Sequence, residues 1–454
     1  MLLASMLFSA CATQTYEASP IAPTQIAEQW RAQNLHDPQL LSYINTSATP
    51  APIQIWGLPE LTLAAFYFNP DLNVVKSQWL ATQAAEITAG QKPNPKISAS
   101  SEHHGKATGI SPWTLTLGVE IPIETHGKRE ARTQQSTAMT EAAQLEIAQA
   151  AWRIRSQIRA RLLDIYAIRQ QTAQIAHEVN LHTQIVQLLQ ARLDKGLASA
   201  TELSEAALHL RKARTQMKTE WARMADARIQ LASVMGLPES ALANIPLAFT
   251  AFEQDTNTLP ADAVQRAALL NRLELRRALA RYDAAEARLK LEIAKQYPDF
   301  NLGPGYSWDQ GDNRWSLGLS LVLALLNKNE GPIAEAKAQR DVVAQQFNAL
   351  QTSILSEQEQ ALTRWQAAQE AIPQAQTLLK AQLDRLEQTR QQFDAGLADR
   401  LELTNAQLEL VAAEARILAA KHHAQQVLGQ LEDAVQQPLD GSAALPEMPR
   451  EKSQ

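Results

Sequence analysis

Hydrophobic residues recur along this chain with two different periods. From Lys128 to about Lys195 neither proline nor glycine occurs, and apolar residues recur at heptad-like steps. At about 1.5 Å of rise per residue, this stretch predicts one helix of about 100 Å. A second stretch, 403–431, places apolar residues at alternating steps of three and four, which is typical of coiled-coil packing. Its many alanines predict a close approach of helices rather than a wide core.

Two other regions, about 95–123 and 298–325, alternate strictly between apolar and polar or small residues. In each, the apolar positions of the second strand begin with tryptophan: Trp113, Leu115, Leu117, Val119 and Ile121, then Trp315, Leu317, Leu319, Leu321 and Leu323. A half-buried strand of a soluble sheet has the same period. Nothing else in the chain could pack such a sheet. The alternation therefore favours membrane strands, with one face toward lipid and the other toward a lumen.

The two halves of the chain repeat each other. Asp-Lys-Gly-Leu-Ala at 194–198 and Asp-Ala-Gly-Leu-Ala at 394–398 are each followed, four residues later, by glutamate and leucine. Chance similarity between two helices rich in alanine and leucine does not explain the matched aspartate, glycine and glutamate. We therefore predict a mainly α fold with a small transmembrane β part, in two repeats of helix, hairpin, very long helix and long helix.

These patterns divide the chain into segments. They are a lipoprotein-type signal (1–10), a lipid-anchored arm (11–55) with one short helix near 24–33, a first repeat (56–240), an equatorial linker (241–261), a second repeat (262–437) and a C-terminal tail (438–454). Four strands per chain cannot close a barrel, and open sheet edges are not tolerated in lipid. We therefore expect the chain to oligomerise. The alternative is a lipid-anchored or soluble coiled-coil scaffold without a pore.

Composition and charge exclude several classes of protein. The formal net charge of −6 leaves no broad basic face, so nucleic acid is not an expected partner. No apolar run reaches the roughly 18 residues that a spanning helix needs. No nucleophile constellation, phosphate-binding loop or zinc-spaced set of cysteine and histidine occurs in the sequence. We expect neither an enzyme nor a cofactor.

Two pairs of adjacent histidines, His103–His104 and His422–His423, invite a metal-site interpretation. Adjacent side chains point to opposite faces of a strand and lie about 100° apart on a helix, so neither pair chelates a metal alone. A metal site needs three or four ligands that converge. We expect solvated histidines and no metal, with His103 and His104 in the extracellular loop of the first hairpin.

The single cysteine, Cys11, directly follows a short apolar stretch. Ser9 and Ala10 before it resemble a bacterial lipobox, in which the signal is cut and the cysteine is lipidated. Phe8 stands where leucine is usual, and no lysine or arginine precedes it, although signal peptides normally begin with positive charge. The alternative is an apolar tail with a buried thiol. We predict that Cys11 becomes the mature N-terminus and carries lipid in the outer membrane.

The order of elements and several motifs resemble the TolC-type outer-membrane efflux family from about Ile55 to Gln436. The motifs are Ile-Pro-Ile-Glu-Thr-His-Gly-Lys-Arg at 121–129, Leu-Glu-Ile-Ala-Lys-Gln-Tyr-Pro-Asp-Phe at 291–300 and Leu-Leu-Asn-Lys-Asn-Glu-Gly-Pro-Ile-Ala-Glu at 325–335. Within the family they are most similar to the CzcC-like branch of heavy-metal RND efflux channels. One position departs from the family pattern, because Ala324 stands where the first half has Pro122.

The resemblance implies a homotrimer, with a 12-stranded β-barrel in the outer membrane and a long α-helical barrel in the periplasm. It implies the exit duct of a tripartite efflux system, which receives its substrate from an inner-membrane RND-type pump through a periplasmic adaptor. Metal cations are the substrate that this branch suggests. Organic solutes or drugs are the alternative.

The glycine turns between the long helices are the candidate sites. Leu197 follows Gly196 and Leu397 follows Gly396, so an apolar residue stands at each exposed tip, where solvation would favour a polar one. These four residues are predicted to contact the adaptor.

Two acidic residues, Glu202 and Glu402, lie six residues beyond the tip glycines. The resemblance implies that they face the lumen near its closed end, as two rings of carboxylates that attract cations. The alternative is an ordinary glutamate that favours the start of its own helix.

Overall fold

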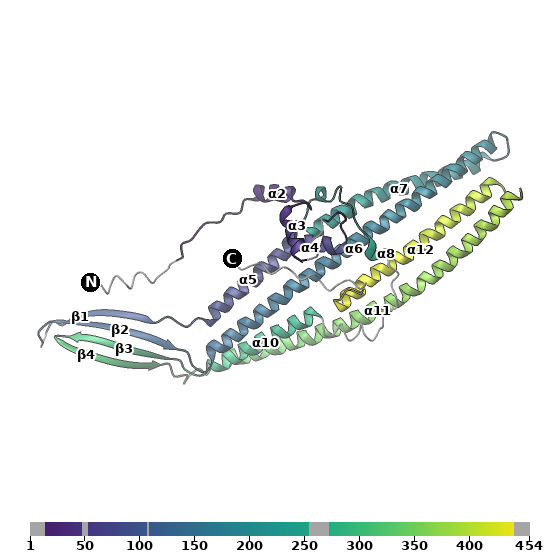
Figure 1. Ribbon diagram of the computed structural model, residues 1–454. Coiled ribbons are helices and arrows are strands. Elements are labelled where there is room, and N and C mark those ends of the chain that lie inside the picture. The colour runs from purple at the N-terminus through teal and green to yellow at the C-terminus, as the bar shows by residue number, and fades with distance from the viewer. Residues whose placement is uncertain (1–13, 48–52, 107–108, 254–271, 440–454) are drawn as a thin grey trace.

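The computed structural model describes residues 14–47, 53–106, 109–253 and 272–439. They form a long rod, with a four-stranded sheet at one end and two helical hairpins at the other (Figure 1). The first half contributes α5 (Pro70–Gly90), β1 (Lys96–His103), β2 (Trp113–Ile123), α6 (Lys128–Leu193) and α7 (Ala200–Met235). The second half contributes α10 (Leu273–Ala294), β3 (Phe300–Asp309), β4 (Asp312–Leu321), α11 (Glu330–Asp394) and α12 (Arg400–Val435).

Both halves repeat the predicted order of helix, two strands, very long helix and long helix. The mainly helical fold is confirmed, and all four strands lie within the regions 95–123 and 298–325. β4 ends at Leu321, so Leu323, which was predicted to continue the alternation, lies beyond the strand. There the chain turns toward α11, and the amide of Leu325 donates to the carbonyl of Leu323 at 2.9 Å.

The strands pair antiparallel in the order β1-β2-β3-β4, so β1 and β4 are the sheet edges. The register places Leu115 beside Trp308 and Leu117 beside Tyr306. Because side chains alternate along a strand, these apolar residues share one face, and the polar residues between them share the other. The sheet is therefore two-faced, as the alternation predicts.

His103 corrects one sequence prediction, because it lies within β1, opposite Trp113, and not in the hairpin loop. Its ring centroid lies 4.9 Å from that of Trp113, and such cross-strand aromatic pairs stabilise a ladder. His104 follows the strand, and its Nε2 lies 2.9 Å from the hydroxyl oxygen of Thr114.

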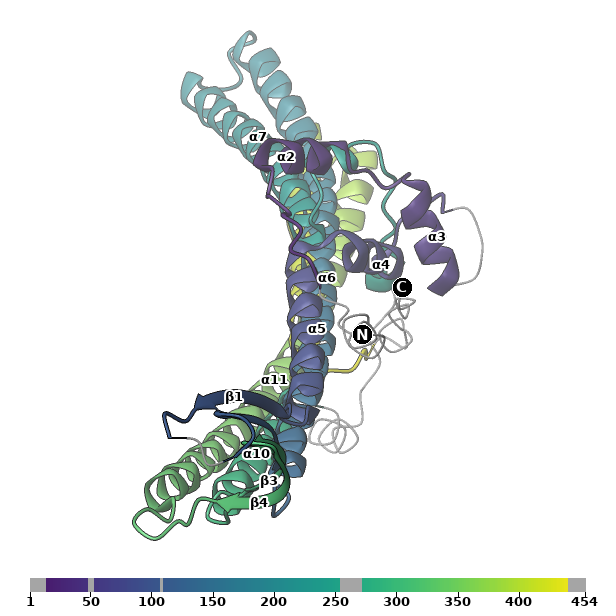
Figure 2. The same cartoon turned by 90° about the vertical axis from the view of Figure 1, so that its left-hand side faces the viewer.

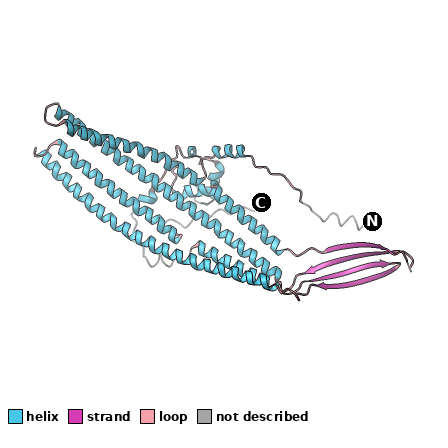
Figure 3. Cartoon of the chain, turned by 180° about the vertical axis from the view of Figure 1, so that it is seen from behind, coloured by secondary structure: helices cyan, strands magenta, loops and turns pink. Residues whose placement is uncertain are grey.

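Four long helices lie side by side in the order α7, α6, α12, α11 (Figures 1 and 3). The inner pair, α6 and α12, comes from different halves of the chain. α6 runs unbroken from Lys128 to Leu193, as the absence of proline and glycine predicts. Within the described ranges, no helix is both long and apolar enough to cross a bilayer.

The main apolar core lies near the middle of the rod, where α4 (Leu58–Phe68) packs against α6 and α7. Leu61, Ile158 and Leu231, one from each of these helices, are completely buried. Two further short segments, η1 (Glu239–Ala241) and α8 (Thr250–Glu253), follow α7 and add residues to this core.

The N-terminal arm holds two helices, α2 (Pro23–Ala32) and α3 (Pro38–Ser47), beside the long helices (Figure 2). α2 is the short helix that the sequence predicts. α3 was missed, because Leu40 and Ile44 are only one helical turn apart and give too short a periodic pattern. Both side chains are buried in the main core, so tertiary packing stabilises this short helix.

A buried ionic cluster fixes α12 to α6 near the core. A carboxylate oxygen of Glu432 lies 3.3 Å from Arg155 Nη1 and 3.2 Å from Arg159 Nε, and all three side chains are almost completely buried. Arg159 also donates to the carbonyl of Gln425 at 2.9 Å. Charges that are this deeply buried need such partners, so the cluster fixes how the two halves of the chain pack.

Candidate functional site

The two hairpin tips lie near each other at the end of the rod opposite the sheet (Figure 1). Gly196 and Gly396 adopt left-handed backbone conformations, with φ of +72° and +73°. In both tips the amide after the glycine donates to the carbonyl five residues earlier, at 2.8 Å. This bond closes a helix end and requires a left-handed residue before the donor. A Cβ at either glycine would meet nothing within 4 Å, so backbone conformation, not space, requires glycine here.

Leu197 and Leu397 project from these turns. Their side chains are 74% and 81% exposed, so neither contributes to the packing of its own hairpin. An exposed leucine is common on protein surfaces, but here the same residue occupies the same place at both tips. The structure thus brings all four predicted tip residues to one end of the rod. Their contact with an adaptor stays a prediction.

Glu202 and Glu402 each take part in a capping box at the start of α7 or α12. Oε2 of Glu202 accepts from the amide of Ser199 at 2.7 Å, and the Ser199 hydroxyl oxygen accepts from the amide of Glu202 at 3.2 Å. Hydrogen bonds from Ser199 lower the pKa of Glu202. Glu402 accepts from the amide of Asp399 at 2.8 Å. Both glutamates therefore satisfy amides at helix starts, while the carboxylate rings stay a prediction.

A salt bridge that the sequence did not reveal joins the two tips. Arg192 Nη2 lies 2.6 Å from Asp399 Oδ2, and the two side chains are 34% and 46% exposed. The other oxygen of Asp399 accepts from the amides of Leu401 and Glu402 at 2.7 and 2.9 Å. The hydrogen bond from Arg192 is the main cause that lowers the pKa of Asp399. One carboxylate thus both caps α12 and binds α6.

A small apolar cluster lies beneath this salt bridge. Ile185 and Leu189 of α6 are buried together with Ala206 of α7, and Leu401 and Leu408 of α12 pack against them. The two hairpins are therefore in contact at their tips as well as at the buried ionic cluster near the core.

The remaining predicted residues lie elsewhere. Cys11 lies outside the described residues. His423 is exposed as predicted, whereas His422 is half-buried between α6 and α12, contrary to the expectation of a solvated side chain. No group of three or more histidine, cysteine, aspartate or glutamate side chains in the described part of the chain could hold a metal ion.

Comparison with known protein families gives a match that spans both repeats. The family described as "Outer membrane efflux protein" matches residues 65–237 and 264–435. Among curated proteins, the chain is similar to the cobalt-zinc-cadmium resistance protein CzcC of Cupriavidus metallidurans. The two are 24% identical over 364 residues, which cover 77% of this chain and 82% of that protein.

Several solved structures share the fold. The outer membrane protein VceC of Vibrio cholerae is 20% identical with a TM-score of 0.68, and the match covers 83% of this chain and 95% of that one. CusC is 16% identical with a TM-score of 0.68 and coverages of 83% and 91%. The outer-membrane channel OprN is 17% identical with a TM-score of 0.68 and coverages of 84% and 90%. At these identities the likeness establishes the fold.

Proposed function

Because the chain belongs to the outer membrane efflux protein family, we propose that it is the outer-membrane exit duct of a tripartite efflux system. Members of this family are transport ducts and not enzymes. Substrate would pass from an inner-membrane RND-type pump, through a periplasmic adaptor and this duct, to the outside. Cys11 would carry the lipid anchor, and the helices would extend into the periplasm.

The observation that carries this proposal is the open, two-faced sheet joined directly to very long helices. The edge strands β1 and β4 have no partner strand on their outer sides among the described residues. β1 carries the exposed Ile97, and β4 carries Trp315 and Leu317, which are 82% and 73% exposed. A sheet with such edges and such a face cannot remain open in lipid. Antiparallel pairing of β4 with β1 of the next copy would close it.

Three copies would supply twelve strands and twelve long helical staves. The outer helices α7 and α11 of each chain would contact the neighbouring copies. The inner helices α6 and α12 would lie at the centre of the part of the helical barrel that each chain contributes. The tip leucines would then form a ring of apolar contacts at the pump end, where the adaptor would dock. Glu202 and Glu402 would add carboxylates near the same end.

Metal cations are the cargo that we propose first. The curated relative CzcC is named for resistance to cobalt, zinc and cadmium, and the motifs at 121–129 and 325–335 resemble the same branch. In a host that lacks this chain, we expect cobalt, zinc or cadmium to accumulate, and expression of the full chain should restore export. If the host that lacks the chain instead keeps its normal metal content and accumulates an organic dye, organic solutes and not metals are the cargo.

The assembly is tested separately. Native mass spectrometry of the full chain, extracted from outer membranes in mild detergent, should give a trimer, because barrel closure requires more than one chain. A folded monomer in that fraction would contradict the proposed duct. The pore-free scaffold would be supported instead if the chain were released from membranes without detergent.

A further inference from the structure

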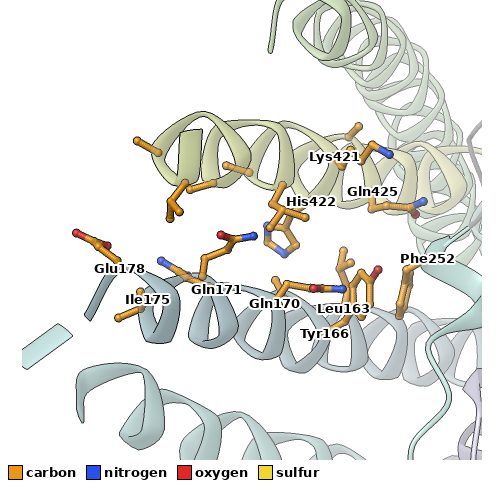
Figure 4. Close-up of a pocket in the computed structure, with 18 of the residues that line it drawn as sticks. Leu163, Tyr166, Gln170, Gln171, Ile175, Glu178, Phe252, Lys421, His422 and Gln425 are labelled. Carbon is orange, nitrogen blue, oxygen red and sulfur yellow. The ribbon is translucent and has the colours of Figure 1, made fainter. Parts of the chain in front are cut away.

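A cavity separates α6 from α12 between the two places where they are joined. Near the core, Arg159 binds Gln425, and at the tips Arg192 binds Asp399. Between these contacts the helices leave a cavity of about 440 Å³ (Figure 4). This volume lies within the range of small-molecule sites in proteins.

The side chains that face each other explain why the helices do not close here. α12 contributes alanines at steps of three and four residues, namely Ala412, Ala415 and Ala419. From α6, three glutamines line the same cavity: Gln170, Gln171 and Gln174. Small side chains opposite flexible amides do not interlock as large apolar ones would. These alanines lie outside the predicted seam, whose Ala406, Ala413 and Ala424 are buried.

Two polar atoms that line this cavity have no hydrogen-bond partner among the described residues. They are the side-chain oxygen of Gln174 and Nε2 of His422, and both atoms are inaccessible to solvent. Figure 4 shows the His422 ring pointing from α12 toward α6, into the space between the helices. Buried polar atoms in native proteins nearly always have a partner. Because neither atom is accessible to water in this structure, a molecule in the cavity would supply a partner after a small rotation of either side chain.

The lining is mostly uncharged. Burial lowers the pKa of His422, so its imidazole is neutral at pH 7. Three charged residues line the cavity: Glu178 at one end, Glu253 next to Phe252, and Lys421, which points away from α6 (Figure 4). At the other end, the rings of Tyr166 and Phe252 lie 6.0 Å apart and form an aromatic wall. The carboxylates disfavour an anion, whereas an uncharged aromatic ring can stack against the wall.

We propose that this cavity binds a neutral, planar aromatic molecule that carries a hydroxyl or amine donor. The ring would lie against Tyr166 and Phe252, and its donor would satisfy Gln174 or His422. The site lies between the two inner helices of one chain, so neighbouring copies at α7 and α11 would leave it uncovered. The proposal goes beyond the exit duct and does not depend on what that duct carries.

The test is equilibrium dialysis of 2-naphthol against the full chain held in amphipol, which leaves no free detergent to compete. We expect saturable binding with one site per chain. Ala415→Leu places three more carbon atoms in the cavity and should weaken the saturable binding. Ala381→Leu changes an alanine of α11 that is exposed and does not line the cavity, and it should bind as the unaltered chain does. Circular dichroism confirms that each variant folds.

Two further variants keep the test decisive if Ala415→Leu does not fold. Gln174→Leu and His422→Phe each remove the unpartnered atom together with the other polar atom of the same side chain. Because 2-naphthol has a single donor, one of the two variants should weaken its binding by about tenfold. Naphthalene, which has no donor, should bind both variants as it binds the unaltered chain. Any of three results would overturn the proposal. They are uptake of 2-naphthol without a saturable component, undiminished binding to folded Ala415→Leu, and equal losses of binding for naphthalene and 2-naphthol.

Discussion

Arg192 and Asp399 join the end of α6 to the start of α12, with 2.6 Å between Nη2 and Oδ2 across 207 residues of sequence. Asp399 is also the N-cap of α12. Its carboxylate therefore performs two tasks, since it satisfies amides of its own helix and binds the other hairpin. The pair therefore helps to fix the position of one hairpin tip relative to the other.

Arg192→Ala should loosen the tips without unfolding the protein. Both side chains are partly exposed, and such pairs contribute about 0.2–1 kcal/mol. We expect amide hydrogen exchange in the first turn of α12 to rise by up to about fivefold, with an unchanged melting temperature. Arg385→Ala is the matched control, because Arg385 pairs with Glu409 inside the second hairpin. Equal exchange at the tip in both variants would show that the Arg192 pair does not hold the hairpins together.

Stability should fall as pH is lowered because of His422. Its pKa is lowered chiefly by burial, while Asp164 opposes this shift and His423 and Arg223 reinforce it. A histidine with a lowered folded pKa binds its proton more readily in the unfolded chain. Protonation below the unfolded pKa of about 6.5 therefore favours unfolding.

The measurement is the melting temperature at pH 7.5 and 5.5. His422→Gln removes the titrating group and should reduce the drop between these two pH values. His423→Gln removes only the smaller contribution of the exposed neighbour and should reduce the drop less. If both variants behave like the unaltered chain, His422 does not contribute to the pH dependence of stability.

Gly236 should not tolerate a side chain. It ends α7 with φ of +80°, and a Cβ there would lie 2.8 Å from the carbonyl oxygen of Phe68. Gly236→Ala combines a strained backbone with this clash and should cost about 1–3 kcal/mol of unfolding free energy. Gly331→Ala, in the first turn of α11 with nothing within 4 Å of its added Cβ, should be neutral or slightly stabilising. Equal melting temperatures for the two variants would contradict this account.

Much of this fold could be predicted because its elements have strong local signals. The alternation after Trp113 and Trp315 predicts strands, and the absence of proline or glycine after Lys128 predicts one long helix. The matched aspartate, glycine and glutamate around the two tips recur at a fixed offset, which predicts the repeat itself. Each of these signals lies within a few residues of the element that it specifies.

Contacts between distant segments could not be predicted in the same way. The bond from Arg192 to Asp399 depends on how two hairpins pack, and neither residue is unusual in its own helix. The cavity beside His422 was missed for a related reason. Alanine on a helix face permits close approach, but whether the neighbour comes close depends on the residues opposite, here glutamines such as Gln174.

The last prediction concerns Leu197 and Leu397, which are 74% and 81% exposed. Replacing both by aspartate should leave trimer assembly and melting temperature nearly unchanged, because the tips lie at the opposite end of the rod from the strands (Figure 1). Export should fail, since an unpaired carboxylate buried against an adaptor costs several kcal/mol. Replacing both by methionine keeps the apolar surface and should preserve export. Normal export by the aspartate variant would mean that the tips are only turns and that the adaptor docks elsewhere, along the grooves between the helices.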